Sequence, residues 1–325
     1  MNKRILVIGG AGYIGSHMVK MLADLGTSVI VLDNLTTGYA DAARYGKLVI
    51  GDTADRLLLE RLFTEHTFSG VMHFAAFSQV GQSSQHPAMY YRNNVINTMN
   101  VLDAITSHGS PPLVFSSTAA VYGEPRQIPI PEAHPLSPIN PYGNSKLMVE
   151  TMLADYERAY GLRWAALRYF NAAGADPAGE LGERHNPETH LIPLCLQVAA
   201  DLRPHLAVYG DDYPTPDGTC IRDYVHVEDI CSAHLLALRH LQAGGISRPW
   251  NLGNGTGFSV AEVLDTVRAI TSAALPFEVV ARRPGDPAIL VANASDIQQR
   301  LGWDPRYPDL ETIIRHAWQW MRNTG

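Results

Sequence analysis

Short apolar runs alternate with longer amphipathic segments through the first 170 residues of the chain. The runs are too short for helices, and several are rich in valine and isoleucine, which is typical of strands buried on both faces of a parallel sheet. The segments between them repeat apolar residues with helical spacing. We predict strands at residues 5–8, 29–32, 48–50, 71–74, 113–115 and 164–167, and helices that include 14–25, 56–66 and 93–108.

This alternation predicts an α/β fold of the Rossmann type, a doubly wound parallel sheet with helices on both faces. From residue 171 onward the pattern breaks into shorter, loop-rich pieces with frequent proline and glycine. We expect residues 1–170 to form the nucleotide-binding domain. Residues 171–325 would form mainly a smaller C-terminal α/β substrate lobe, with some segments returning to the sheet.

The composition excludes several classes of function. Of the 325 residues, 46% are hydrophobic and 18% are charged, which is typical of a globular chain with a sizeable core. The net charge of −7 is opposite in sign to that of most nucleic-acid-binding proteins. The three cysteines form no CxxC pair, and no apolar stretch approaches the roughly 18 residues of a membrane span. We expect a cytoplasmic protein that binds neither nucleic acid nor membrane.

A glycine-rich turn joins the first predicted strand to the first predicted helix. Gly9, Gly12 and Gly15 would let the backbone turn tightly and approach a pyrophosphate at the helix N-terminus. Asp33 ends the second predicted strand, where a carboxylate can accept both ribose hydroxyls of a dinucleotide. Residues 34–38 contain no arginine or lysine to pair with a 2′-phosphate, which favours NAD over NADP. An ordinary turn, or a capping role for Asp33, is the alternative.

Tyr142 and Lys146 follow a predicted helix start, with Asn140 as its cap and Pro141 at its first position. The four-residue spacing places both side chains on one face of a helix over 142–160. A phenol with an ordinary pKa of about 10 is a poor base at neutral pH. A nearby ammonium, together with a nicotinamide cation and the helix N-terminus, would lower that pKa toward the physiological range. We predict an acid–base pair; a surface Tyr–Lys pair is the alternative.

The fifth predicted strand ends in Ser116, Ser117 and Thr118, at the edge where ligands of such sheets bind. The order of glycine turn, hydroxyl and Tyr/Lys pair resembles the extended branch of the short-chain dehydrogenase/reductase superfamily. There a hydroxyl matching Thr118 shares the substrate oxygen with the tyrosine; a strand-end cap is the alternative. The resemblance implies these cofactor contacts: Gly9, Gly12, Tyr13, Ile14, Gly15, Asp33, Asn34, Leu35, Thr36, Thr37, Gly38, Asp52, Thr53, Phe74, Ala75, Ala76, Ser78, Asn94, Ser116, Tyr142, Lys146 and Phe170.

Longer strings, among them residues 10–17, 116–123, 168–174, 209–215 and 217–227, resemble the UDP-glucose (UDP-galactose) 4-epimerases. The resemblance implies reversible epimerisation at C4 of UDP-glucose and UDP-galactose through a transient 4-keto sugar and tightly bound NAD. Ala119 and Ala120 stand where related dehydratases carry acidic residues, and neither can transfer a proton. The alternatives are a 4-epimerase of UDP-N-acetylhexosamine, UDP-glucuronate or UDP-pentose, and a catalytically silent NAD- or nucleotide-sensing protein. A homodimer through the helices at 93–108 and 142–160 is expected from the resemblance alone.

The resemblance also implies which residues hold the UDP-sugar. Arg222 and Arg283 would pair with the pyrophosphate, and Asp286 would contact the uridine ribose. The implied substrate-binding set is Val80, Thr118, Tyr142, Asn171, His190, Leu191, Ala207, Val208, Tyr209, Arg222, Arg283, Asp286 and Leu290.

Three positions depart from the pattern of the family. Ser78 replaces a cofactor-binding lysine of some relatives, and His190 stands at the position of a substrate-binding asparagine, with a packing histidine as the alternative. Leu290 occupies the sugar-gate position, where its intermediate size leaves acceptance of N-acetylhexosamines open. We expect no metal, because the histidines show no HExxH motif and no clustered Cys/His spacing.

Overall fold

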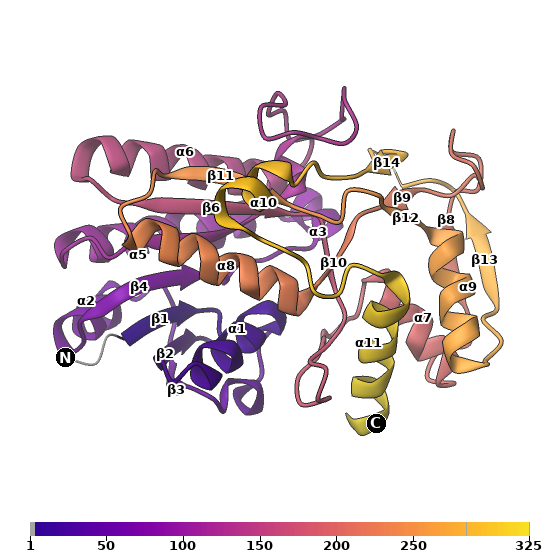
Figure 1. Ribbon diagram of the computed structural model, residues 1–325, viewed down its shortest axis with the longest axis horizontal. Coiled ribbons are helices and arrows are strands. Elements are labelled where there is room, and N and C mark those ends of the chain that lie inside the picture. Colours follow the sequence, from indigo (N-terminus) through magenta and orange to yellow (C-terminus); the bar gives the residue numbers. More distant parts are fainter. Residues whose placement is uncertain (1–3, 284, 325) are drawn as a thin grey trace.

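The computed structural model describes residues 4–283 and 285–324. Its centre is a seven-stranded sheet in the order β11-β6-β5-β4-β1-β2-β3, in which every neighbouring pair is parallel (Figure 1). The sheet strands are β1 (Arg4–Ile8), β2 (Ser28–Asp33), β3 (Lys47–Ile50), β4 (Phe68–His73), β5 (Leu113–Thr118), β6 (Trp164–Tyr169) and β11 (Arg248–Leu252). The predicted doubly wound α/β fold is confirmed, and all six predicted strands are present.

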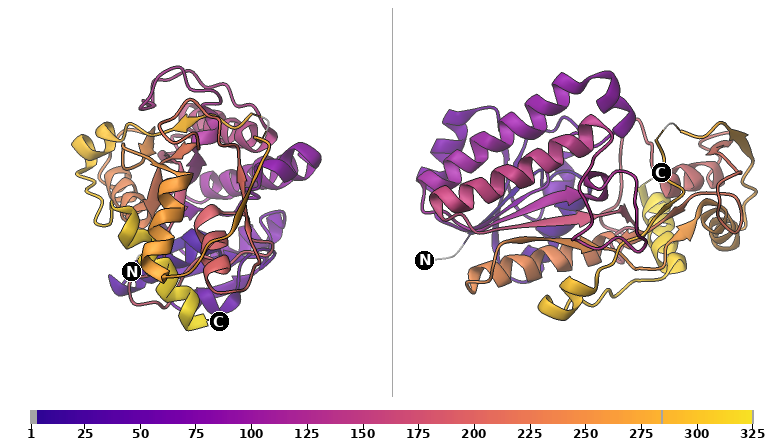
Figure 2. Two further views of the ribbon diagram at one scale, coloured as in Figure 1. Left: turned by 90° about the vertical axis from the view of Figure 1, so that its right-hand side faces the viewer. Right: turned by 90° about the horizontal axis from the view of Figure 1, so that it is seen from above.

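Helices cover both faces of this sheet and enclose one apolar core on each side. The helices and 3-10 turns of this part are α1 (Tyr13–Asp24), η1 (Ala40–Ala43), α2 (Arg56–Glu65), α3 (Val80–Gln85), α4 (Pro87–Tyr90), α5 (Asn97–Ser107), η3 (Ala119–Val121), α6 (Pro141–Tyr160), α8 (Val227–Gln242) and α10 (Ser295–Leu301). One core lies under α1, α8 and α10, and the other lies under α2, α5 and α6. In Figure 2 (right), α5 and α6 run side by side over one face of the sheet.

The helix predicted at 93–108 has a different start. A π-helical turn, η2 (Tyr91–Ile96), precedes α5. Within that turn Asn94 is buried and bonds through its side chain to the backbone of Phe77 and to the hydroxyl of Ser145. Single π turns are frequent at functional sites because they redirect one side chain. Here the redirected side chain ties the loop after β4 to helix α6.

The smaller lobe has a third core of its own, formed mainly by side chains of α7, α9 and α11. Its elements are β7 (Asn171–Ala173), α7 (Leu191–Ala199), β8 (Leu206–Tyr209), β9 (Ile221–Arg222), β10 (Tyr224–His226), β12 (Phe258–Ser259), α9 (Val260–Thr271), β13 (Phe277–Val280), β14 (Ile289–Leu290) and α11 (Leu310–Thr324). The lobe lies at the end of the sheet to which the strands point (Figure 1). Ligands of open α/β sheets bind at that edge.

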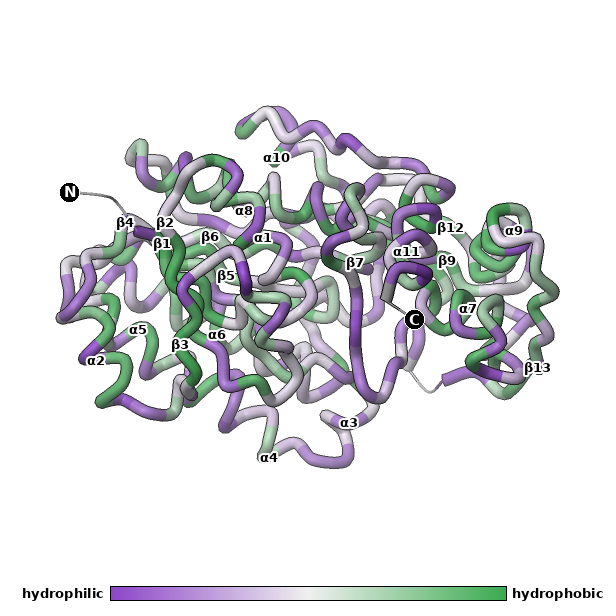
Figure 3. Tube along the Cα trace, turned by 90° about the horizontal axis from the view of Figure 1, so that it is seen from below, coloured by the Kyte–Doolittle hydropathy of each residue, from purple (hydrophilic) through white to green (hydrophobic). Residues whose placement is uncertain are grey.

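Hydrophobic segments gather along the strands and the packed helices. Figure 3 colours much of the trace near β1, β3 and α7 as hydrophobic, while loops at the outside are hydrophilic. Among the described residues, no helix combines the length and the apolar character needed to cross a membrane.

Candidate active site

The glycine turn after β1 is fixed by close packing of the backbone. Gly9 has φ +80°, and a Cβ there would lie 2.4 Å from the backbone nitrogen of Ala75. A Cβ on Gly15 would lie 2.1 Å from the carbonyl oxygen of Gly9. The fold itself therefore requires glycine at these two positions.

Gly12 is different, because the protein itself does not require a glycine there. Its backbone is extended, with φ −81° and ψ 176°, and a Cβ would make only an ordinary contact of 3.4 Å with Gly9. Gly12 is also the N-cap of α1, and no side chain caps that helix end. The uncapped start of α1 offers free N–H groups to an anion, and glycine at residue 12 leaves room beside them. Both features fit the pyrophosphate of a dinucleotide.

Gly12→Ala should weaken NAD binding about tenfold or more while changing the free energy of unfolding by less than about 1 kcal/mol. Gly15→Ala is the matched control, since its Cβ meets backbone and should destabilise the fold by about 3 kcal/mol or more. Urea unfolding and titration of the purified variants with NAD measure the two effects. Equal loss of stability in both variants would contradict this division of roles.

Asp33 joins the glycine turn to the loop that follows β2. Its two carboxylate oxygens accept the backbone N–H groups of Ala11, at 2.9 Å, and of Leu35, at 2.8 Å. Tyr39 N–H donates to Ala11 O at 2.9 Å, so residues 34–38 lie against the turn. Asp33 therefore does cap backbone N–H groups, as the alternative interpretation proposed. A carboxylate has about four acceptor positions, which leaves capacity for ribose hydroxyls as well.

The other residues expected to bind the cofactor surround this turn at the carboxyl edge of the sheet. Asn34 donates to Asp52 at 2.7 Å, which links the ends of β2 and β3. Tyr13 donates its hydroxyl to Gly174 O at 2.7 Å. The loops after β2, β3, β4 and β6, helix α1 and strand β5 carry the remaining predicted contacts: Ile14, Thr36, Thr37, Gly38, Thr53, Phe74, Ala75, Ala76, Ser78, Ser116 and Phe170.

Tyr142, Lys146 and Thr118 come together where β5 ends and α6 begins. Asn140 caps α6 by accepting Gly143 N–H at 2.9 Å, and Pro141 occupies the first turn, as the sequence predicts. The Thr118 side chain lies beside the Tyr142 hydroxyl, where it lowers the pKa of the phenol. The Lys146 ammonium donates to Ser116 O at 2.8 Å and lies 4.7 Å from the centre of the Phe115 ring. Two hydroxyls and one ammonium thus share a small region.

Burial shifts the pKa of both members of this pair. It raises the pKa of Tyr142 to about 12, although the neighbouring Thr118 side chain lowers it. Burial also lowers the pKa of Lys146 to about 7, although the nearby Glu150 carboxylate raises it. The expected lowering of the Tyr142 pKa toward the physiological range includes the charge of a bound nicotinamide, so it stays a prediction for the protein with NAD.

A buried charged network behind the pair was not predicted. The Glu150 carboxylate accepts the Ser117 hydroxyl at 2.5 Å and Arg168 Nε at 3.0 Å. Arg168 also donates to the Tyr122 hydroxyl at 3.0 Å. Glu150 follows Lys146 by one helical turn, so the i,i+4 spacing was a usable signal. The network holds β5, β6 and α6 together directly under the candidate catalytic residues.

The residues expected to bind UDP lie in the lobe. Arg222, on β9, forms an ion pair with Asp286 and is buried. The Arg283 guanidinium stacks 3.9 Å from the ring centre of Tyr209, at the end of the β8 segment that also holds Ala207 and Val208. A UDP ligand would have to share or replace the contact between Arg222 and Asp286.

The remaining predicted substrate residues flank the catalytic groups. Leu290, on β14, packs against the apolar cluster of Val121, Tyr122 and Ile130 that follows Thr118. Asn171 begins β7, and its N–H donates to Asp223 O at 3.0 Å. Val80 begins α3, and Leu191 begins α7 directly after His190.

His190 has partners that the sequence analysis did not foresee. It lies in a cluster with Glu183, His185 and Glu188, whose ligand atoms all lie within 4.8 Å of one another. The signal that could have found the cluster is the pattern Glu-x-His-x-x-Glu-x-His over residues 183–190.

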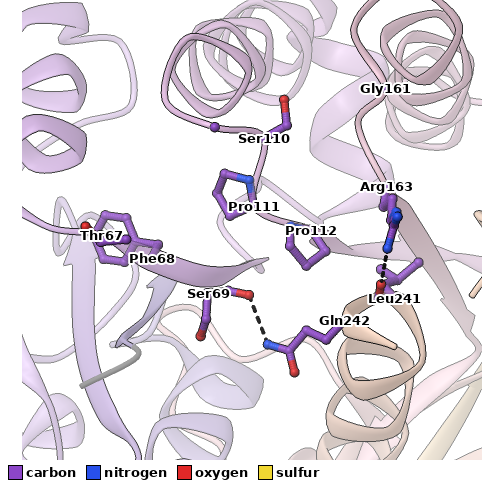
Figure 4. A pocket seen from close by; sticks show the side chains of 11 residues that line it. Thr67, Phe68, Ser69, Ser110, Pro111, Pro112, Gly161, Arg163, Leu241 and Gln242 are labelled. Carbon is purple, nitrogen blue, oxygen red and sulfur yellow. Dashed lines mark hydrogen bonds between the residues drawn. The ribbon is translucent and has the colours of Figure 1, made fainter. Parts of the chain in front are cut away.

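A cavity of about 570 Å³ lies at the opposite, amino edge of the sheet, near the starts of β4, β5 and β6 (Figure 4). Gln242 donates to Ser69 O at 2.9 Å and Arg163 donates to Leu241 O at 3.2 Å on its wall. No predicted site residue lines it. A smaller cavity of about 20 Å³ adjoins the glycine turn at Gly12 and Tyr13.

The chain matches a known protein family over most of its length. Residues 5–253 match the NAD dependent epimerase/dehydratase family. The chain belongs to this family.

Individual relatives of this epimerase/dehydratase family member cover nearly the whole chain. It is 54% identical over 316 residues to the UDP-glucose 4-epimerase of Halalkalibacterium halodurans, covering 97% of this chain and 95% of the relative. A UDP-glucose 4-epimerase structure from Brucella ovis in complex with NAD matches with a TM-score of 0.95 and 49% identity over 97% of each chain.

A further solved structure contains NAD together with a UDP-sugar. The UDP-glucose 4-epimerase of Stenotrophomonas maltophila, with bound NAD and formylated UDP-arabinopyranose, matches with a TM-score of 0.94. It is 40% identical and covers 99% of this chain and 98% of its own. The family expected from the sequence is confirmed for this epimerase/dehydratase.

Proposed function

We propose that the protein is an NAD-dependent UDP-glucose 4-epimerase, which interconverts UDP-glucose and UDP-galactose through a transient 4-keto sugar. The observation that carries the proposal is that the Thr118 side chain lies beside the Tyr142 hydroxyl, one helical turn from Lys146. The names of the relatives and the NAD and UDP-sugar held by two of the solved structures support the same reaction.

The residues divide the work. As the phenolate, Tyr142 takes the proton of the sugar's 4-hydroxyl, and the resulting phenol later returns it to the sugar oxygen. Thr118 binds the same sugar oxygen and fixes its position. Lys146 adds positive charge, which favours the phenolate form of Tyr142. The glycine turn and Asp33 would hold NAD, which would supply a reversible hydride acceptor for C4.

The smaller lobe binds the UDP part of the substrate. Arg222, Asp286 and Arg283 offer charge to the UDP part, while Leu290 presents an apolar side chain near the sugar end of the site. This division holds UDP firmly and leaves the hexose few polar contacts. The hexose can then present either face to the same catalytic groups.

A coupled assay of the purified protein tests the substrate. UDP-galactose should be converted without added NAD, with a kcat/KM at least about tenfold higher than that of UDP-N-acetylgalactosamine or UDP-glucuronate. Preference for either of the other sugars would move the assignment to that epimerase. No turnover of any sugar by protein that contains NAD would favour a nucleotide-sensing role instead.

We also propose a homodimer that packs through α5 and α6. Four apolar side chains on η2, α5 and α6 are exposed, namely Ile96, Met99, Met148 and Tyr160. A group of exposed apolar side chains on neighbouring helices is typical of an association surface. Light scattering should give about twice 35.6 kDa, and Met148→Glu should shift the protein toward the single-chain mass. A single-chain mass for the unaltered protein would contradict the proposal.

A cytoplasmic location is part of the same proposal. The three cysteines, Cys195, Cys220 and Cys231, are all free and buried. Free thiols are typical of proteins that work in a reducing compartment.

A further inference from the structure

Four potential metal ligands meet in the irregular segment between β7 and α7. Glu183, His185, Glu188 and His190 come from eight consecutive residues, and none of them lies in a helix or strand. Both histidines present Nδ1 to both carboxylates. The four nitrogen–oxygen separations are 3.2 and 3.6 Å for His185 and 2.5 and 3.4 Å for His190.

These separations are close to the edges of a metal-centred tetrahedron. Zinc bonds to imidazole nitrogen and to carboxylate oxygen are about 2.0–2.2 Å long, so neighbouring ligand atoms lie about 3.3–3.5 Å apart. Three of the four separations fall near that range, but Glu188 faces His185 with Oε2 and His190 with Oε1, so one of its two contacts would change when a single oxygen binds the ion. The contact between His190 and Glu183 is shorter and would widen around an ion.

The carboxylates of the cluster are buried, whereas the side chains of His185 and His190 are 28% and 49% exposed. The side chains of Glu183 and Glu188 are only 6% and 5% exposed. Glu183 Oε1 and His185 Nδ1 are both buried, and neither makes a hydrogen bond of acceptable geometry. A buried carboxylate oxygen facing a buried imidazole nitrogen without such a bond is costly unless something between them satisfies both. A cation that accepts electron pairs from both atoms does this.

We propose that Glu183, His185, Glu188 and His190 bind one divalent metal ion, with zinc the best fit to two imidazoles and two carboxylates. A dication balances the two buried carboxylates when both imidazoles are neutral. Imidazole suits zinc and other late transition metals, whereas magnesium and calcium prefer all-oxygen ligand sets. This site departs from the expectation from sequence that the protein holds no metal.

The position of the cluster gives the ion a structural role. The same irregular segment is already held to the large domain by two ion pairs, Lys20–Asp176 at 2.8 Å and Arg184–Asp41 at 2.7 Å. The ion would add a third constraint at residues 183–190, where the His185 ring lies 6.4 Å from the ring of Tyr13. It would thereby fix the segment that leads into α7 beside the glycine turn.

Metal analysis of protein prepared without a histidine tag tests the proposal. We expect about one zinc ion per chain by mass spectrometry after extensive dialysis, and a lower melting temperature after removal with a chelator. Replacement by Co²⁺ should give the intense visible absorption of a four-coordinate site. Each readout is independent of epimerase activity, so failure here leaves the proposed function standing.

Two variants and one control locate the ion. His185→Ala and Glu188→Gln should each weaken metal binding by about 100-fold or more, beyond the 10- to 100-fold typical of outer partners. His205→Ala, an exposed histidine just before β8, should keep the metal. Unaltered protein with no stoichiometric metal and no cobalt spectrum would overturn the proposal, and two protons on the histidines would then balance the carboxylates. Equal metal content in His185→Ala and His205→Ala would overturn it as well.

Discussion

Tyr142→Phe should lower kcat for UDP-galactose by a factor of about 100 to 10,000, the usual contribution of a positioned acid–base group. The ring keeps its place at the start of α6, and only the hydroxyl beside the Thr118 side chain is lost. KM should change much less than kcat, because the lobe rather than the phenol holds the UDP part. Initial rates in the coupled assay give both constants.

Tyr160→Phe is the matched control, since Tyr160 lies at the opposite end of the same helix and phenylalanine keeps the ring that would pack in the proposed dimer. Its rate should equal that of the unaltered protein. The free energy of unfolding of Tyr142→Phe should fall by no more than about 1.5 kcal/mol, the value of one hydrogen bond. A Tyr142→Phe enzyme with kcat within about threefold of normal would remove Tyr142 from the proton transfer.

Lys146→Met should make the protein less active and more stable. Burial lowers the pKa of Lys146 to about 7, whereas in the unfolded chain it is about 10.4. Between these two values the unfolded chain binds the extra proton, so the stability of the unaltered protein falls as the pH falls from about 10 to 7 and then levels off. Methionine removes this penalty but loses the bond to Ser116 O. We expect a net gain of about 2 kcal/mol at pH 7.

Urea unfolding at pH 7 and at pH 10, at matched NAD content, measures this effect. The advantage of Lys146→Met should shrink toward pH 10, where the lysine is already neutral in the folded protein. Lys47→Met, on an exposed position of β3, should leave the pH dependence unchanged. A stability gain that is equal at both pH values would show that the ammonium carries no burial penalty.

Most of the sheet could be predicted from sequence because its strands are buried on both faces. All of β5 is buried, and its apolar first half, residues 113–115, is the part that hydrophobicity marks. β11 was missed because it contains Pro249 and Asn251, which argue against a central strand. It lies at the edge of the sheet, where proline is tolerated. Only the folded chain shows which edge a segment from the second half joins.

The parts of the candidate site formed by residues close in sequence could be predicted. The parts that depend on contacts between distant segments could not. The cap, Pro141, Tyr142 and Lys146 lie within one short stretch, so their spacing predicts their common face. The pKa of Tyr142 depends instead on burial by distant segments, which no spacing reports. The cluster at 183–190 depends on how an irregular loop folds, and neither period 2 nor period 3.6 applies to it.

A crystal structure of the protein with NAD and UDP-glucose tests the central claim most directly. We expect the sugar O4 to lie about 2.6–3.2 Å from both the Tyr142 hydroxyl and the Thr118 hydroxyl. Lys146 should lie on the cofactor side of the phenol. An O4 atom out of reach of Tyr142, with another titratable side chain in its place, would contradict it.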